Sequence, residues 1–143
     1  MKTIYASKHG HSKKVANMFV DCHDATSNPT LDSEIILFVC PTYGDEELHP
    51  AMEKFLISIT EKTKKYVICE LGNYYGYEDF SFGARKIIES HLKKLGWTEF
   101  FPSLSLDSMP SIDWQTFNDW KAGLNNAVQN RGRSRSSIDQ QND

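Results

Sequence analysis

Residues 35–40 constrain the fold of this chain more than any other stretch. They read Ile-Ile-Leu-Phe-Val-Cys, a run that is apolar throughout and mostly β-branched or aromatic. Such a run is typical of a strand buried on both faces, in the middle of a parallel sheet. The loop that follows, residues 41–48, contains one tyrosine, one glycine and three carboxylates. Ligands bind beyond the carboxyl ends of strands in open α/β sheets, so this loop is a candidate binding site.

Strands and helices alternate along the rest of the chain. Other extended segments are predicted at residues 1–6, 19–23, 66–71 and 97–106, the last interrupted at Pro102. Apolar residues at helical spacing predict helices that carry Val15, Met18 and Phe19; Met52, Phe55, Leu56 and Ile59; Ala84, Ile87, Ile88, Leu92 and Leu95; and Phe117, Trp120, Leu124 and Val128. Five strands alternating with four helices predict a single-domain α/β fold, doubly wound around a parallel sheet of order 2-1-3-4-5.

Length and composition fit one folded domain with a tail. The chain has 143 residues, of which 39% are hydrophobic and 12% aromatic. No apolar run approaches the ~18 residues of a membrane span, and the first residues resemble a strand rather than a signal peptide. We therefore expect a cytoplasmic protein. Residues 1–129 are predicted to form the domain, and residues 130–143 a polar, basic tail that is too poor in apolar residues to be ordered.

The charge and the cysteines exclude some classes of site. A net charge of −3 argues against nucleic acid as a partner. The three cysteines, Cys22, Cys40 and Cys69, lack CxxC or Cys/His spacing, so we expect reduced thiols and no metal site.

The loop after the first strand, residues 7–12, has the features of a phosphate site. Ser7 and Ser12 supply hydroxyls, and Gly10 lets the backbone approach a ligand closely. Lys8, His9 and His11 add positive charge, and a helix begins here, whose free N–H groups suit an anion. Taken alone, the loop is equally consistent with an ordinary capped turn. It contains neither a Walker motif nor GxGxxG, which argues against nucleotide hydrolysis.

Aromatic residues gather in the loops after the third and fourth strands. Tyr43 stands beside Gly44 and Asp45, and residues 72–80 contain three tyrosines within four positions, Tyr74, Tyr75 and Tyr77. A tyrosine ring offers a large rigid contact to a flat ligand. The loops after the first, third and fourth strands meet at one edge of the predicted sheet, with Glu46, Glu47, Glu78 and Asp79 as an acidic rim.

These three loops resemble those of the flavodoxin family. The first, Ser7-x-x-Gly10-x-Ser12, resembles the family's T-x-T-G-x-T phosphate loop. Residues 41–48, Pro-Thr-Tyr-Gly-Asp-Glu-Glu-Leu, are similar to its S/P-T-W/Y-G-D-G/D-E-L loop, the most specific of the three. Residues 72–84 resemble its G-D-S-S-Y-x-x-F-C-G-A segment. The resemblance covers roughly residues 2–128.

The resemblance implies FMN held without a covalent bond. The residues it places around the cofactor are Ser7, Lys8, His9, Gly10, His11 and Ser12 at the phosphate, and Pro41, Thr42, Tyr43, Gly44, Asp45, Leu71, Gly72, Asn73, Tyr75, Tyr77 and Asp79 around the ring. Tyr43 would cover one ring face. Tyr77, three residues before Phe80 as in the family, would cover the other, with Tyr74 and Tyr75 as alternatives. The peptide between Gly44 and Asp45 would bond flavin N5 on reduction, and glycine permits the required flip.

The chain also departs from the family pattern. His9 replaces a hydroxyl, Asn73 replaces a carboxylate, and the loop at residues 72–80 is one residue longer. The segment from the first helix to the third strand is shortened, and the chain is less acidic than is usual for flavodoxins.

By resemblance the protein is an electron carrier without substrate turnover of its own. Its expected partners are a reductase of the ferredoxin–NADP type as donor and oxidoreductases as acceptors, each docking transiently on a monomer. The alternative is an NrdI-like flavoprotein that activates a dimanganese ribonucleotide reductase, favoured by the compact first βα unit and by the pair Gly72 and Asn73. A receiver-type signalling module is disfavoured, because Thr42 and Tyr43 stand where a phosphoacceptor Asp is needed.

Overall fold

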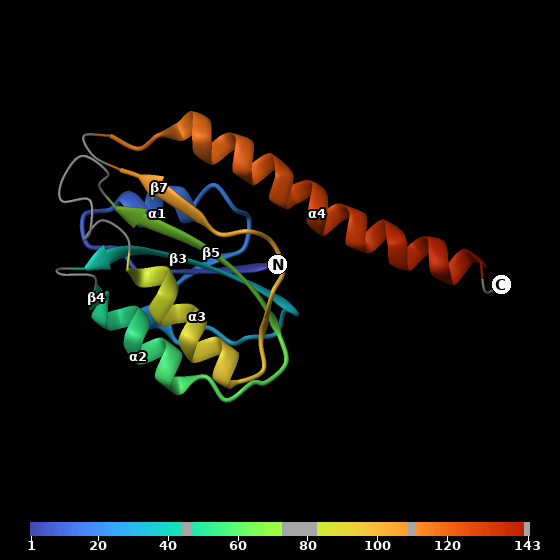
Figure 1. The fold of residues 1–143 in the computed structure, drawn as a ribbon, viewed down its shortest axis with the longest axis horizontal. Helices are drawn as coiled ribbons and strands as arrows, with labels where there is room; N and C mark the ends of the chain where they lie inside the picture. The colour runs from blue at the N-terminus through green and yellow to red at the C-terminus, as the bar shows by residue number, and fades with distance from the viewer. Residues whose placement is uncertain (44–46, 73–82, 109–110, 142–143) are drawn as a thin grey trace. The chain divides into compact units, whose positions relative to one another are not determined.

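The computed structural model describes residues 1–43, 47–72, 83–108 and 111–141. The chain divides into two compact units, residues 1–113 and residues 114–143. The first unit contains a sheet flanked by helices, and the second contains the last helix (Figure 1). The predicted domain boundary at residue 129 stays a prediction.

The sheet of the first unit is mostly parallel. The parallel strands are β1 (Lys2–Tyr5), β2 (Cys22–Asp24), β3 (Ile35–Tyr43), β5 (Lys65–Gly72), β6 (Thr98–Glu99) and β7 (Leu104–Asp107). They are ordered β2-β1-β3-β5, and both β6 and β7 pair with β5. The predicted order is confirmed, because β6 and β7 are two parts of the predicted fifth strand, separated by a segment that contains Pro102. The strand β4 (Glu47–Leu48) was not predicted and pairs antiparallel with the end of β3.

Helices cover both faces of this sheet. The helices α2 (Pro50–Ser58) and α3 (Ala84–Lys94) lie side by side on one face, and α1 (His11–Ala16) lies on the other (Figure 1). A 3₁₀ turn, η1 (Ala25–Ser27), follows β2. Pro50 is the first residue of α2, and the ring of His49 accepts a hydrogen bond from the N–H of Ala51 at 3.1 Å. Such a cap satisfies one of the free donors of the first turn.

The first helix is shorter than its apolar spacing predicted. The N–H groups of Met18 and Phe19 bond carbonyls three residues back, at 3.1 and 3.0 Å, and this tightens the chain into a turn after Ala16. Phe19 is buried while Met18 is exposed, and the second strand begins at Cys22 instead of residue 19.

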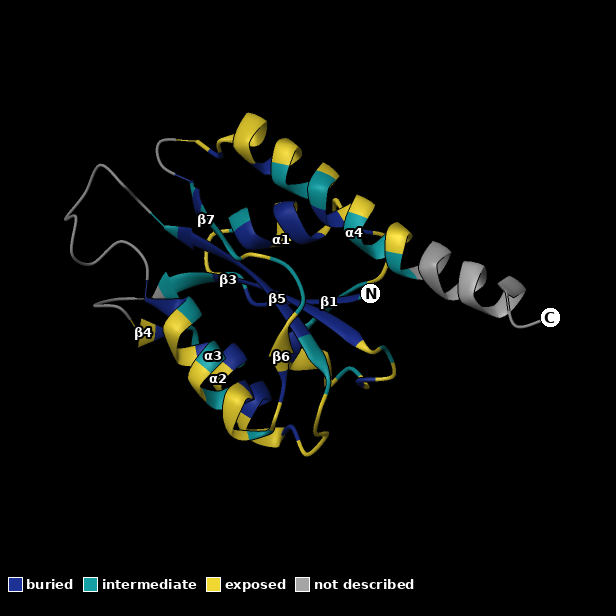
Figure 2. Ribbon diagram, turned by 45° about the vertical axis from the view of Figure 1, so that its right-hand side comes forward, coloured by how far each residue is buried: buried dark blue, intermediate teal, exposed yellow. Residues whose placement is uncertain are grey.

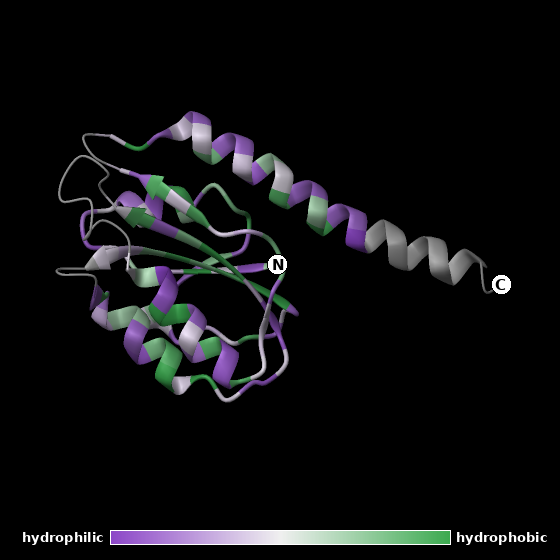
Figure 3. Cartoon of the chain, in the orientation of Figure 1, coloured by the Kyte–Doolittle hydropathy of each residue, from purple (hydrophilic) through white to green (hydrophobic). Residues whose placement is uncertain are grey.

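The core is organised around β3. Residues 36–40 are completely buried, as the unbroken apolar run predicted (Figure 2). The apolar stripe of α2 is buried in full, and that of α3 is buried at Ala84, Ile88 and Leu92. Figure 3 shows the resulting pattern, in which hydrophobic and hydrophilic residues alternate along both helices. Each helix therefore buries one face against the sheet and leaves the other exposed.

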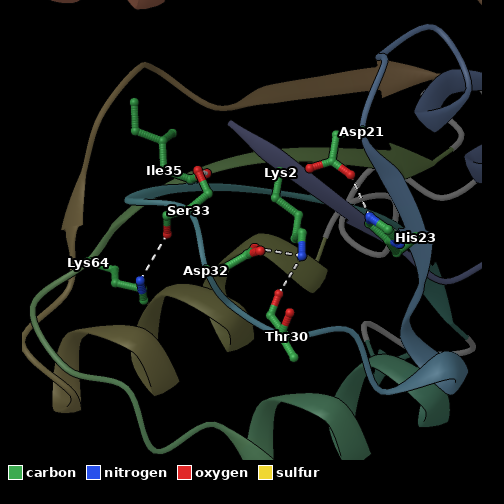
Figure 4. A network of polar contacts seen from close by, with 8 residues as sticks. All are labelled: Lys2, Asp21, His23, Thr30, Asp32, Ser33, Ile35 and Lys64. Atoms are coloured by element: carbon green, nitrogen blue, oxygen red, sulfur yellow. Dashed lines mark hydrogen bonds and ion pairs between the residues drawn. The ribbon is translucent and has the colours of Figure 1, made fainter.

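A buried lysine ties the loop before β3 to the amino end of the sheet. The Lys2 side chain is 7% exposed, and its Nζ donates to the carbonyl of Thr30 at 2.6 Å and pairs with Asp32 at 2.7 Å (Figure 4). The hydrogen bond that Lys2 donates to the Asp32 carboxylate holds the pKa of Asp32 below its usual value. Lys64 donates to the carbonyl of Ser33 at 2.9 Å. These bonds lie at the end of the sheet opposite to the candidate loops.

The second unit is the helix α4 (Trp114–Gln141). Phe117 and Leu124 are buried, and the ring of Phe117 meets those of Trp114 and Trp120 at centroid distances of 5.7 and 6.2 Å. The sequence predicted a helix that ends near Val128 and a disordered tail from residue 130, whereas α4 continues to Gln141. Arginine and glutamine are good helix formers, and Gly132 is the only strong helix breaker in this part of the sequence.

Two residues with positive φ lie close together in space and provide a test of backbone strain. Gly96 follows α3 with φ of 79°, and Thr63, whose N–H donates to the carbonyl of Leu95, has φ of 59°. A Cβ at Gly96 would find only ordinary contacts, so Gly96→Ala should lower the free energy of unfolding by about 1–2 kcal/mol through conformation alone.

The reverse change is the control. Thr63→Gly should raise the free energy of unfolding, because it relieves a conformation that β-branched residues rarely adopt. Urea unfolding measures both variants. Effects of the same sign would contradict this account.

Candidate functional site

The carboxyl ends of the parallel strands bring the starts of the three candidate loops together. Tyr5 on β1 pairs with Val39 on β3, and the next N–H, that of Ala6, donates to the carbonyl of Val39 at 3.1 Å. Pro41 on β3 pairs with Leu71 on β5. The loops that leave β1, β3 and β5 therefore begin at one edge of the sheet, where ligands bind in this class of fold.

The loop after β1 is shaped by Gly10. This residue precedes α1 with φ of 87°, a conformation that favours glycine. Its N–H donates to Oγ of Ser7 at 2.9 Å, and its carbonyl accepts the N–H of Lys14 at 3.0 Å. A Cβ placed on Gly10 would meet no atom within 4 Å, so the loop has open space beside this residue.

Ser12 is the most informative residue of this loop. Its side chain is buried, and its Oγ has no hydrogen-bond partner among the described residues. A buried hydroxyl left unpaired costs about 1–3 kcal/mol, and such groups in native proteins often mark a ligand position. Lys8 and His9 are exposed nearby, whereas His11 is half-buried. A buried hydroxyl, a left-handed glycine and basic residues fit a phosphate group.

The second loop begins inside the β3–β4 pair. Thr42 lies opposite Leu48, and Tyr43 lies opposite Glu47. Pro41 and Thr42 are half-buried, and Oγ1 of Thr42 accepts the N–H of Gly83 at 3.0 Å. This bond joins the end of β3 to the residue before α3. Gly44 and Asp45 lie outside the described residues.

The third loop is described only at its two ends. Leu71 is buried and Gly72 half-buried, and the carbonyl of Gly72 accepts the N–H and the hydroxyl of Ser108 at 2.9 and 3.2 Å. The predicted site residues Asn73, Tyr75, Tyr77 and Asp79 lie outside the described residues, as does Tyr74. Which tyrosine stacks on a ligand stays open.

Sequence reasoning missed a buried carboxylate beside the candidate site. Glu70 is 1% exposed, two residues before Gly72, and its Oε1 has no hydrogen-bond partner among the described residues. Oε2 lies 3.9 Å from Nε of Arg85, and the carboxylate also accepts the backbone N–H of Arg85. Burial raises the pKa of Glu70 to about 7, while the nearby Arg85 charge opposes the shift. A single charged residue within the apolar run at residues 66–71 was the available signal.

The two sheet cysteines are chemically quiet. Cys40 and Cys69 are both completely buried, and burial raises the pKa of each thiol. Cys69 pairs in register with Val39, the neighbour of Cys40. Successive residues of a strand point to opposite faces, so the two thiols lie on opposite sides of the sheet.

Two further kinds of site are not found in the described part of the chain. None of its His, Cys, Asp and Glu residues form a group of three or more that could hold a metal ion. None of the helices searched there is long and apolar enough to cross a membrane.

The described fold, with its doubly wound sheet and loops at the carboxyl edge, is the flavodoxin-like fold. A cysteine-to-alanine variant of flavodoxin from Pseudomonas aeruginosa aligns with 90% of this chain and 99% of its own, at a TM-score of 0.69 and 20% identity. Oxidised flavodoxin 2 from Bacillus cereus aligns with 75% of this chain and 84% of its own, at a TM-score of 0.60 and 24% identity. A flavodoxin from Streptococcus pneumoniae TIGR4 aligns with 74% of this chain and 83% of its own, at a TM-score of 0.58 and 21% identity.

Comparison of the sequence alone gives no such match. No family model and no curated protein matches the chain. The fold predicted from the alternation of strands and helices, which the loop resemblance also implied, is thus confirmed by structure, at identities that show the fold and not the ligand.

The titration of Glu70 should be visible in the stability of the protein. The folded-state pKa of about 7 lies above the usual 4.5, so the folded state favours the protonated form. Stability from this group is present below pH 4.5 and is lost as the pH rises to about 7. Between pH 4.5 and pH 8, the free energy of unfolding of Glu70→Gln should therefore gain about 3 kcal/mol relative to the wild type.

Denaturant unfolding of both proteins across this pH range measures the difference. Glu53→Gln is the control, because it removes a carboxylate that is exposed on α2. A constant difference between wild type and Glu70→Gln would show that Glu70 does not titrate here.

Proposed function

We propose that this protein is a flavodoxin, an electron carrier that binds FMN without a covalent bond. The observation that carries the proposal is the buried hydroxyl of Ser12, which has no hydrogen-bond partner in the part of the chain that the structure describes. It lies in the first turn of α1, directly after the loop held by Ser7 and Gly10, at the edge of the sheet where this class of fold binds ligands. The solved structures that share the fold and are named above are flavodoxins.

The chain offers residues for both ends of the cofactor. Residues 7–12 would hold the phosphate, with Ser12 as a hydrogen-bond donor and Lys8 supplying charge. Tyr43 would cover one face of the ring and one of the tyrosines at 74, 75 and 77 the other. The hydrogen bond from the N–H of Gly83 to Oγ1 of Thr42 joins the start of the second loop to the end of the third. The two loops that would cover the faces of the ring are therefore held together at this point.

FMN supplies the redox chemistry when it is bound. The protein would orient the ring, exclude water from it and set its electrostatic surroundings. Glu47 is exposed on β4. With its sequence neighbours Asp45 and Glu46, it would add negative charge near the ring. Like-charge repulsion disfavours added electrons and so lowers the reduction potential.

A carrier of this kind has no substrate of its own and meets its partners briefly. The proposed electron donor is a reductase of the ferredoxin–NADP type, and the proposed electron acceptors are other oxidoreductases. The proposed compartment is the cytoplasm. Transient docking through complementary charge suits a monomer.

One observation favours the NrdI-like alternative. The first βα unit is compact, with six residues in α1 and three in β2. Reductive titration separates the two functions, because a low-potential carrier needs a strongly reducing second electron step. Closely spaced potentials without such a step would favour activation of a ribonucleotide reductase.

The first test is binding of FMN by the purified protein. We expect a yellow protein that binds FMN in a one-to-one ratio. Ser12→Ala should weaken binding about tenfold or more, the equivalent of one hydrogen bond to a charged group. Quenching of flavin fluorescence measures the affinity.

The chain provides a matched control for this test. Ser103 also has a buried hydroxyl without a described partner, but it precedes β7 at the amino end of that strand. Ser103→Ala should leave FMN affinity unchanged. A protein that takes up no FMN would overturn the proposal, and equal effects of the two variants would remove Ser12 from the site.

The role proposed for Gly44 gives a second test. If the peptide between Gly44 and Asp45 flips to bond the reduced flavin, Gly44→Ala should oppose the flip by about 1 kcal/mol. The potential of the first electron should then fall by about 40 mV. Spectroscopic redox titration measures it, and an unchanged potential would contradict the flip.

A further inference from the structure

A groove of about 400 Å³ runs between α2 and α3, on the outer surface of the first unit. The two helices lie side by side (Figure 1), and both carry exposed residues (Figure 2). Leu48 and Leu56 are buried at the groove, and Ile57, Ile87 and His91 are among its other lining residues. Its volume falls within the range of about 300–1,000 Å³ that is usual for binding pockets.

Large apolar side chains are exposed on both walls of this groove. Ile57 on α2 is 70% exposed, and Ile87 on α3 is 39% exposed. Ile87 belonged to the predicted core stripe of α3 but lines the groove instead. Exposed apolar residues on both helices that line one groove indicate a surface that another molecule covers.

The groove also carries more positive than negative charge. Lys86 and Lys94 line it from α3, against one carboxylate, Glu53, from α2. Lys94 lies in the last turn of α3, where a cation favours the helix dipole. Lys86 lies in the first turn, where a cation is unfavourable and which has no acidic residue of its own. Among the described residues, neither lysine forms an ion pair.

We infer that this groove is the docking site for an acidic amphipathic helix of a partner protein. The apolar face of that helix enters between Ile57 and Ile87, and its carboxylates meet Lys86 and Lys94. These lysines are eight residues apart, about 12 Å along α3, so they match carboxylates two turns apart on the partner. The charge of the groove, opposite in sign to the net charge of −3, selects an acidic partner.

The position of the groove suggests what docking achieves. Leu48, at one end, belongs to β4, which pairs with the last residues of β3 before Gly44. A partner seated here lies next to the carboxyl edge of the sheet. From there the partner could exchange electrons with a cofactor at that edge. That role rests on the proposed function, whereas the docking itself does not require FMN.

Two synthetic helical peptides of about four turns test the inference with the full chain. Both carry leucines at i, i+3, i+4 and i+7, flanked by glutamates in one peptide and by lysines in the other. Fluorescence anisotropy should show that the glutamate peptide binds at least about tenfold tighter at low salt. The preference should shrink as salt is added. No binding of the glutamate peptide, or equal binding of both, would overturn the inference.

Variants locate the binding site on the protein. Ile57→Asp, and Lys86→Glu combined with Lys94→Glu, should each weaken binding of the glutamate peptide about tenfold or more. Lys54→Glu and Lys93→Glu lie on the same helices outside the groove and should leave binding unchanged. Equal losses in the two sets would overturn the inference. The inference would also be overturned if the wild-type protein were a dimer and Ile57→Asp dissociated it. The occupant of the groove would then be a second copy of this chain.

Discussion

The structure depends on hydrogen bonding along β3, which pairs in parallel with β1 on one side and β5 on the other. Residues 36–40 have no access to water, so every polar group of their backbone must be satisfied by a neighbouring strand. A shift of one residue would reverse the faces of the strand, moving Phe38 away from α2 and α3. The register in which β3 pairs with its neighbours thus determines which residues reach the carboxyl edge of the sheet. The position of the candidate site therefore depends on packing in the core, at a distance from the site.

Two buried charged residues mark the two ends of this sheet. Lys2, at the amino end, is fully engaged by a carbonyl and a carboxylate, so it fastens the loop before β3. Glu70, near the carboxyl end, keeps one oxygen without a described partner and lies 3.9 Å from its nearest cation. Ser12 also has a buried polar atom without a described partner, and like Glu70 it lies toward the end where a ligand would bind. The same is not true of the buried hydroxyls of Thr3 and Ser103, which lie near the amino ends of β1 and β7.

Local patterns in the sequence predicted the features that local physics controls. The apolar run of β3 and the stripe of α2 depend on burial periodicity, so each could be predicted. The early end of α1, the pairing of β4 with β3 and the burial of Glu70 depend on neighbours distant in sequence. Ile87 fits a helical stripe and yet lies in the groove, because periodicity does not reveal how wide the buried face is. At the site, Ser12 could be predicted as a residue of the loop but not as a hydroxyl without a partner.

The placement of Cys40 and Cys69 has a consequence for a protein proposed to handle single electrons. Thiols on opposite faces of one sheet cannot form a disulfide without unfolding it. Their raised pKa values keep them protonated, and the thiolate is the form that oxidants attack. The interior of the sheet is therefore electrochemically silent at these two positions, and redox equivalents that reach the protein are not diverted into its own sulfur chemistry.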